Sequence, residues 1–234
     1  MFSVVITRII DDSDFAEFKK EYGKTMVTGW CKIHGYPTGI IANNGVIFLE
    51  SARKATHFIQ LANKSNVPLL FIHNTTGFMV GKKHEQNGMI NSGSQLIHAV
   101  AGSTVPHISL QVGNSYGAGN YAMCGRSFNP RFLFSYPNAK SGVMGSDQLA
   151  GVMEIVKRKS AASLNKEIDE KLLLDEKKKL AFEADKKASV WHTTSEVWDD
   201  GVIDPRDTRN ILSQCLQISL NSKIKETKFG LFRM

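Results

Sequence analysis

The 234-residue sequence contains little cysteine, proline or tryptophan, with three, six and three of them respectively. The cysteines are odd in number and widely spaced, which favours reduced thiols over a disulfide framework. They are Cys31, Cys124 and Cys215. No C-x-x-C or H-E-x-x-H pattern occurs and the seven histidines are scattered, so we expect no metal site.

Long apolar runs are also missing. The run VPLLFI (67–72) is far too short to cross a bilayer. The start, MFSVVITRIIDDSDF, lacks both the apolar segment of a secretory signal and the acid-poor composition of a transit peptide. We therefore expect no membrane partner, and no targeting segment is visible.

The net charge of +7 does not by itself indicate a nucleic-acid partner. In the most lysine-dense region, 154–187, acidic residues are interleaved with the basic ones, which is typical of a solvated helical face. No nucleic-acid motif accompanies it, so we expect no nucleic-acid binding. A mild positive charge suits an anionic small molecule such as a nucleotide-bearing thioester.

Strand-like and helix-like segments alternate, which predicts an α/β fold. Strands are expected at 4–10, 26–33, 39–42 and 46–50, with a hairpin turn at 43–45. A helix is expected from Asp14 to about Tyr22. Ser51 is the expected N-cap of another helix, with an apolar face of Ala55, Phe58, Ile59 and Ala62.

Two similar units follow, each consisting of VP, an apolar strand, a glycine-bearing loop and a helix. They begin at Val67 and Val105 and predict parallel strands. A third strand in RFLFSYP leads into an amphipathic helix. Asp204 is the expected N-cap of the last helix. We predict one domain over 1–234, with a charged helical insertion at about 157–190.

The glycine-rich turns at 76–81 and 116–119 each leave a strand and approach a helix. Backbone N–H groups at such a turn lack intrahelical partners, so they can form an oxyanion hole without side chains. The same glycines can also serve only for tight turns and close packing. A further reading is that GNSYG (113–117) is the nucleophile elbow of a serine hydrolase. Ser115 is then the nucleophile, with Asp147 or Asp169 and His192 as partners.

Four long stretches resemble the carboxyltransferase (β) subunits of biotin-dependent acyl-CoA carboxylases, above all those of 3-methylcrotonyl-CoA carboxylases. They are GYPTGIIANNGVIFLESARKATHFIQLANKSNVPLLFIHNTTGFMVG, GNSYGAGNYAMCGRSFNPRFLFSYPNAKSGVMG, VWDDGVIDPRDTR and the terminal FGLFRM. They cover most of the chain outside the charged insertion. At Tyr121 the resemblance separates this branch from propionyl-CoA carboxylases, which usually have Asp there.

The resemblance implies a crotonase-like spiral of ββα units and only the C-terminal domain of the subunit. It implies carboxyl transfer from carboxybiotin to an acyl-CoA, most specifically 3-methylcrotonyl-CoA in leucine degradation, with biotin itself as the base. Charge then develops on the ureido oxygen and on the thioester oxygen, and the backbone N–H groups of Ala118 and Gly119 are the implied catalytic groups for the first. Implied substrate- and biotin-binding residues are Thr76, Gly77, Phe78, Gly81, Tyr116, Gly117 and Tyr121. Phe78 is equally well explained as core packing.

The implied partners are a biotin-carrying α subunit, the missing N-terminal carboxyltransferase domain and further copies of the chain. Without that domain, the chain alone is expected to be inactive. The implied compartment is the mitochondrial matrix in a eukaryote and the cytoplasm in a bacterium. Besides the hydrolase, two alternatives stay open: a non-catalytic half-subunit, and a crotonase-type acyl-CoA hydratase or hydrolase. The sequence leaves open the exact acyl group, since geranyl-CoA carboxylases share much of this pattern.

Overall fold

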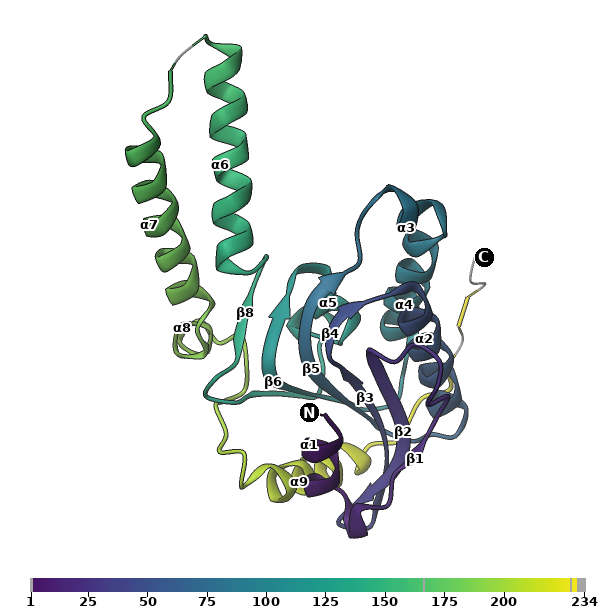
Figure 1. Cartoon of the computed structure of the whole chain (residues 1–234). Helices are drawn as coiled ribbons and strands as arrows, with labels where there is room; N and C mark the ends of the chain where they lie inside the picture. The colour runs from purple at the N-terminus through teal and green to yellow at the C-terminus, as the bar shows by residue number, and fades with distance from the viewer. Residues whose placement is uncertain (1, 166, 228, 231–234) are drawn as a thin grey trace.

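The computed structural model describes residues 2–165, 167–227 and 229–230, so most of the terminal FGLFRM lies outside the described residues. These residues form an eight-stranded sheet in the order β1-β2-β3-β5-β6-β7, with β4 on β5 and β8 on β6 (Figure 1). The strands are β1 (Ala16–Glu17), β2 (Met26–Ile33), β3 (Tyr36–Asn43), β4 (Gly45–Ile47), β5 (Leu69–Phe78), β6 (His107–Tyr116), β7 (Phe132–Ser135) and β8 (Lys140–Gly142). The pairs β1–β2 and β2–β3 are antiparallel, and the other pairs are parallel.

Helices cover both faces of this sheet (Figure 1). Those described are α1 (Phe2–Ile9), α2 (Leu49–Lys64), α3 (Lys82–Gln86), α4 (Met89–Gly102), α5 (Gly117–Ala122), α6 (Ser146–Ser163), α7 (Glu170–Ala188), α8 (Val190–Ser195) and α9 (Thr208–Leu220). Leu69 and Phe71 of β5 pack in one core with α2 and α4, while Leu70 and Ile72 pack in a second core with α1 and α9. Because side chains alternate along a strand, the run VPLLFI fills both cores. It therefore forms a central parallel strand.

Several expected elements are confirmed. Strands occupy 26–33 and 39–42, and β5 and β6 pair in parallel with Leu70 opposite Ile108. The expected strand in RFLFSYP is β7, and the amphipathic helix after it is α6. The expected apolar face of α2, which includes Phe58 and Ile59, is fully buried.

The N-terminal expectations were wrong. Residues 4–10, expected as a strand, belong mostly to helix α1, because Ile6, Ile9 and Ile10 share one helical face that is buried in the second core. This period outweighs the β propensity of the isoleucines and valines. The expected helix from Asp14 to Tyr22 is instead the short strand β1 followed by turns, since Ala16 pairs with Trp30 at the sheet edge.

Two turn and cap predictions were also wrong. Residues 43–45 form no hairpin, because β3 and β4 both run parallel to β5 on the same side. Helix α2 begins at Leu49, so Ser51 lies inside it and its hydroxyl meets that of Thr25 at 2.7 Å. Helix α9 begins at Thr208, and the carboxylate of Asp204 accepts from the backbone N–H of Arg206 instead of capping the helix.

The helices α6 and α7 form a hairpin that stands away from the sheet (Figure 1). The charged segment 157–190 covers the last seven residues of α6, all of α7 and the first residue of α8. Among the described residues of the two helices, only Ala150, Leu173 and Ala188 are buried. The hairpin therefore presents most of its surface to its surroundings.

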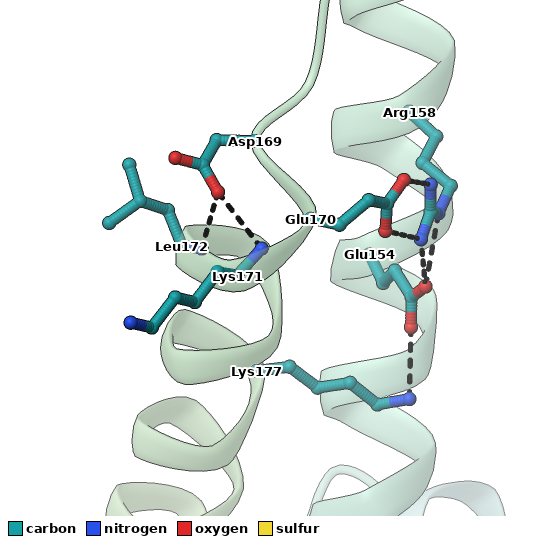
Figure 2. Close-up of polar contacts among 7 residues, drawn as sticks. All are labelled: Glu154, Arg158, Asp169, Glu170, Lys171, Leu172 and Lys177. Carbon is teal, nitrogen blue, oxygen red and sulfur yellow. Dashed lines mark hydrogen bonds and ion pairs between the residues drawn. The ribbon is translucent and has the colours of Figure 1, made fainter.

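Charged side chains hold this hairpin together (Figure 2). The guanidinium of Arg158 on α6 makes a two-point ion pair with Glu170 of α7, at 2.7 and 2.8 Å, and also contacts Glu154 one turn back. Lys177 of α7 reaches Glu154 at 2.9 Å. Asp169 caps α7 by accepting from two backbone N–H groups. Single exposed pairs contribute little, but a connected network contributes more.

Candidate functional site

The two glycine-rich turns lie together at one edge of the sheet. Strands β5 and β6 are parallel and Thr75 pairs with Ser115, so both strands end at the same edge. Within the predicted turn at 76–81, Thr76, Gly77 and Phe78 are still part of β5 and only residues 79–81 leave the strand, while α5 begins directly after β6. In open parallel sheets the carboxyl ends of the strands are where ligands bind.

Glycine is required where the two turns touch. A β-carbon at Gly119 would come within 2.9 Å of the Thr75 hydroxyl and 3.0 Å of the Gly77 Cα, closer than ordinary contact. Gly117 has a φ of 53°, and a β-carbon there would lie 2.8 Å from the carbonyl oxygen of Val143. The small residues thus let α5 start directly against the turn that leaves β5.

The first turn of α5 offers backbone donors. Its N-cap residue, Tyr116, is extended and makes no capping hydrogen bond with its side chain. The first N–H groups of a helix have no intrahelical acceptor, and they point toward the positive end of the helix dipole. Ala118 is exposed at this end, whereas Gly119 is buried beneath it.

A cleft of about 510 Å³ opens beside this helix end. Its lining comes from α5, β6, the 3₁₀ turn at Arg126–Phe128, β7, β8, α8 and the segment after α8, so distant parts of the chain meet there. The lining residues are Gln111, Gly117, Ala118, Asn120, Tyr121, Arg126, Ser127, Ser135, Ser141, Gly142, Val143, Thr193, Trp198 and Asp199. Backbone donors, hydroxyls, a carboxylate and apolar rings therefore share one space.

The predicted site residues fall into two groups. Gly117, Ala118 and Tyr121 line the cleft. The remaining six do not: Thr76, Gly77, Phe78, Gly81, Tyr116 and Gly119. The ring of Phe78 packs against the core and lies next to Gly93 of α4. Tyr116 is buried, and that burial raises the pKa of its phenol.

Ser115 is fully buried, so a substrate cannot reach it. Its hydroxyl lies 2.9 Å from Nδ1 of His73 and accepts from the side-chain amide of Asn120 at 2.8 Å. Burial lowers the pKa of His73 to about 3, and the backbone carbonyl of Met123 offsets only part of this. These contacts tie β5, β6 and α5 together, and they do not support the serine-hydrolase hypothesis.

The hydrolase partners expected from the sequence are engaged elsewhere or exposed. Asp169 caps α7 on the projecting hairpin, and Asp147 is exposed in the first turn of α6. His192 lies on α8, and the hydrogen bonds of Ser115 go to His73 and Asn120 instead. The G-x-S-x-G pattern therefore marks a close-packed turn.

Sequence reasoning missed the residues that complete the cleft, above all Trp198 and Asp199. Asp199 is only 6% exposed, and one of its carboxylate oxygens accepts from the hydroxyl of Thr194. The preceding Val197 has a φ of 58°, which is rare for a β-branched residue and marks a tightly constrained turn. Such a turn is a feature of functional sites, but no local pattern links it to α5.

The described residues contain no group of three or more His, Cys, Asp or Glu side chains placed to hold a metal ion. The three cysteines are free thiols, and burial raises the pKa of Cys124 to about 12. No helix in the described part of the chain combines the length and apolar character needed to span a membrane.

Comparison with known proteins shows to which family this chain belongs. The model of the carboxyl transferase domain matches residues 2–232. The chain belongs to this family. A match over nearly the whole chain includes both glycine-rich turns and every residue that lines the cleft.

Among curated carboxyl transferases, the probable biotin-dependent acyl-coenzyme A carboxylase beta2 subunit of Mycobacterium tuberculosis is 54% identical over 98% of this chain. The mitochondrial methylcrotonoyl-CoA carboxylase beta chain of Arabidopsis thaliana is 46% identical over 98% of it. The chain spans only 44% and 39% of these two relatives. It is thus similar to less than half of each.

Solved structures of carboxyl transferases confirm the crotonase-like fold. The β subunit of geranyl-CoA carboxylase from P. aeruginosa matches 99% of this chain with a TM-score of 0.89 and 43% identity, over 44% of its own length. A transcarboxylase 12S structure with methylmalonyl-coenzyme A and methylmalonic acid bound matches 99% of the chain with a TM-score of 0.85 and 26% identity, over 44% of its length.

Proposed function

We propose that this chain is the C-terminal half of a carboxyltransferase β subunit, which transfers a carboxyl group from carboxybiotin to an acyl-CoA. The observation that carries the proposal is the uncapped first turn of α5, which opens on the cleft through Gly117 and Ala118. Family membership supplies the reaction class. Relatives named as biotin-dependent carboxylases support biotin as the cofactor.

The cleft suits a neutral, flat ring that carries a carbonyl oxygen. One wall consists of backbone at Gly117, Ala118 and Gly142, so the ring can approach the main chain closely. Tyr121 and Trp198 provide apolar surfaces in the same cleft and are each 47% exposed. The ureido ring of biotin has these properties, and when bound as carboxybiotin it supplies the activated carboxyl group.

The role proposed for Ala118 and Gly119 is to stabilise negative charge on an oxygen at the end of α5. Fixed backbone donors in a site with little water are among the strongest devices for this purpose, and removing one typically costs about 10²–10³ in rate. The close approach of Gly119 to Thr75 and Gly77 fixes the start of α5 against β5. These contacts fix the direction in which the donors point.

The remaining site residues are proposed to shape the pocket rather than to react. Thr76, Gly77 and Phe78 are the last residues of β5, and Gly81 follows them. Gly77 lies close to Gly119, so this segment sets the position of the first residues of α5. Tyr116 is the N-cap residue of α5 and is proposed to help position the same helix end. Tyr121 is proposed to contact the acyl chain.

The proposed substrate is 3-methylcrotonyl-CoA, which would place the chain in leucine degradation. Relatives named as methylcrotonoyl-CoA carboxylase beta chains are 44–46% identical. The geranyl-CoA carboxylase β subunit is 43% identical over the matched region, so geranyl-CoA is the competing acyl group. Eukaryotic relatives are named mitochondrial, and a eukaryotic source would place this chain in the matrix and a bacterial one in the cytoplasm.

The proposed partners are an N-terminal carboxyltransferase domain, a biotin-carrying α subunit and further copies of the chain. The relatives are more than twice as long as this chain, and one structural neighbour is described as a hexamer. Exposed apolar side chains on the hairpin give such partners a surface to cover. They include Ile155, Val156, Leu172 and Phe182, between 51% and 71% exposed.

A chimera tests the proposal. The chain replaces the matching segment of the A. thaliana β chain, which is assembled with its biotin-carrying partner and assayed with 3-methylcrotonyl-, geranyl- and propionyl-CoA. We expect carboxylation of 3-methylcrotonyl-CoA above the other two. Ala118→Pro removes one backbone donor in the first turn of α5, where proline is tolerated, and should reduce the rate about 10²–10³-fold. The matched control Ala118→Ser keeps the backbone donor, and its transfer rate should stay within a few-fold of that of the unsubstituted chimera.

An assembled, folded chimera without transfer activity would make the chain a non-catalytic half-subunit. Equal transfer rates for Ala118→Pro and Ala118→Ser would contradict the proposed role of the backbone donors. A preference for geranyl-CoA would correct the acyl group only. Gly119 is unsuited to this test, because any side chain there also clashes with Thr75.

A further inference from the structure

The cleft beside α5 contains a carboxylate with one free oxygen. Asp199 lines the cleft and is 6% exposed. Oδ1 accepts from the hydroxyl of Thr194, whereas Oδ2 is shielded from solvent and has no hydrogen-bond partner within the described part of the chain. A buried carboxylate oxygen without a donor is unfavourable, so a ligand that brings a donor is favoured there.

The neighbouring guanidinium of Arg126 does not donate a hydrogen bond to Oδ2 of Asp199. Arg126 also lines the cleft, but its guanidinium is held by Asp200 at 2.9 Å and by the backbone carbonyl of Trp198 at 3.1 Å. Asp200 in turn accepts from the backbone N–H of Leu133. The two adjacent aspartates therefore differ: Asp200 fastens this segment to β7, and Asp199 is among the residues that line the cleft.

The local backbone holds Asp199 in place. Val197 adopts a left-handed conformation, and the backbone N–H of Trp198 donates to the carbonyl of Thr193 at 3.0 Å. Together with the Thr194 hydroxyl, these contacts fix one carboxylate oxygen and leave the other as an acceptor. The cleft thus offers donors on the α5 side and an acceptor on the Asp199 side.

A cyclic urea matches this pair of features, because its carbonyl is an acceptor and each ring nitrogen without a substituent is a donor. A thioester has no N–H next to its carbonyl. We propose that Asp199 accepts a hydrogen bond from the ring N–H of the biotin ureido group that does not carry the carboxyl group. This inference rests on the proposed function and adds to it the residue that orients the ring.

The test measures binding of small probes to the purified chain by isotope-edited NMR, with amide shifts of Ala118 as the readout. The probes are free biotin, biotin methylated on that ring nitrogen, and pantetheine as a source of open-chain amide N–H groups. For the wild type we expect biotin to bind about tenfold more tightly than its N-methyl derivative. Asp199→Asn keeps the shape and the bond from Thr194 but turns an acceptor into a donor. This substitution should weaken the binding of biotin about tenfold and abolish the preference for biotin over its N-methyl derivative.

Asp147→Asn is the matched control, since Asp147 is exposed and lies outside the cleft. It should leave all three affinities unchanged. Equal binding of biotin and its N-methyl derivative to the wild type overturns the role of Asp199 without any variant, even if Asp199→Asn folds poorly. Loss of pantetheine binding in Asp199→Asn, with biotin unaffected, also overturns it. A wild-type chain that binds neither form of biotin at millimolar concentration contradicts both this inference and the proposed biotin cleft.

Discussion

Two buried histidines should make the stability of this protein fall in mild acid. His73 is fully buried and His107 is 8% exposed, and burial lowers their pKa values to about 3 and about 4. Both imidazoles are neutral in the folded protein at neutral pH. Their neighbours are uncharged, since His73 meets Ser115, and His107 meets Ser103 and the thiol of Cys124.

The sign and size follow from linkage. In the unfolded chain a histidine titrates near pH 6.5, so below that pH the unfolded state binds more protons than the folded state. Stability is therefore unaffected above about pH 7 and is lost as the pH falls from 6.5 toward the lowered values. At pH 5, which lies about 1.5 pH units below the pKa of a histidine in the unfolded chain, each buried histidine lowers the free energy of unfolding by about 2 kcal/mol. Both together lower it by about 4 kcal/mol relative to pH 7.5.

Urea unfolding followed by tryptophan fluorescence between pH 7.5 and 5 measures this loss. The window lies above the titration of the carboxylates that make ion pairs, whose stabilisation is lost only at lower pH. His107→Gln should lower stability at pH 7.5 but halve the pH dependence. The exposed His34→Asn should leave the pH dependence as in the wild type. An unfolding free energy that stays flat from pH 7.5 to 5, or a slope that His107→Gln leaves intact, would show that these imidazoles are not buried as neutral groups.

Three further changes test other contacts. Gly119→Ala pushes a methyl group against Gly77 and should cost about 1–3 kcal/mol in urea unfolding, a result that a wild-type value would contradict. Ser115→Ala leaves the amide of Asn120 without its acceptor and should cost about 1–3 kcal/mol in urea unfolding, while the chimera keeps most of its transfer rate; a folded variant without transfer activity would show that the Ser115 hydroxyl matters for the reaction. The chain should self-associate in sedimentation velocity and Phe182→Lys should weaken this, so a wild-type monomer at tens of micromolar would be the opposing result.

The central strands and the two turns were predictable because their signals are local. A short apolar run after VP is long enough for a strand and too short for a buried helix. The two runs of this kind are β5 and β6. The helix at the N-terminus was missed because VVITRII satisfies both periods. The segment becomes a helix because Ile6 and Ile9 are buried together in the second core, against α9 from the far end of the chain. No local pattern contains that information.

The candidate site was only half visible for a related reason. The turn at Gly117 and Ala118 lies in one continuous motif, but Asp199 reaches the same cleft from a segment far along the chain. The sequence pattern around Ser115 contains no information on exposure, and exposure is what separates a nucleophile from a packed hydroxyl. Tertiary contacts, rather than residue types, therefore settled the meaning of the motif.

The hairpin of α6 and α7 also determines how this protein should respond to ionic strength. Its helices are joined by exposed ion pairs and bury few residues, so its backbone amides should exchange with deuterium well before those of β5. Salt at about 1 M shortens the range of charge interactions to about 3 Å and should speed that exchange, with little effect on the sheet. Because the exposed Ile155, Val156, Leu172 and Phe182 sit on the same two helices, the salt concentration used in purification helps to determine whether a partner meets a formed docking surface or a loosened one.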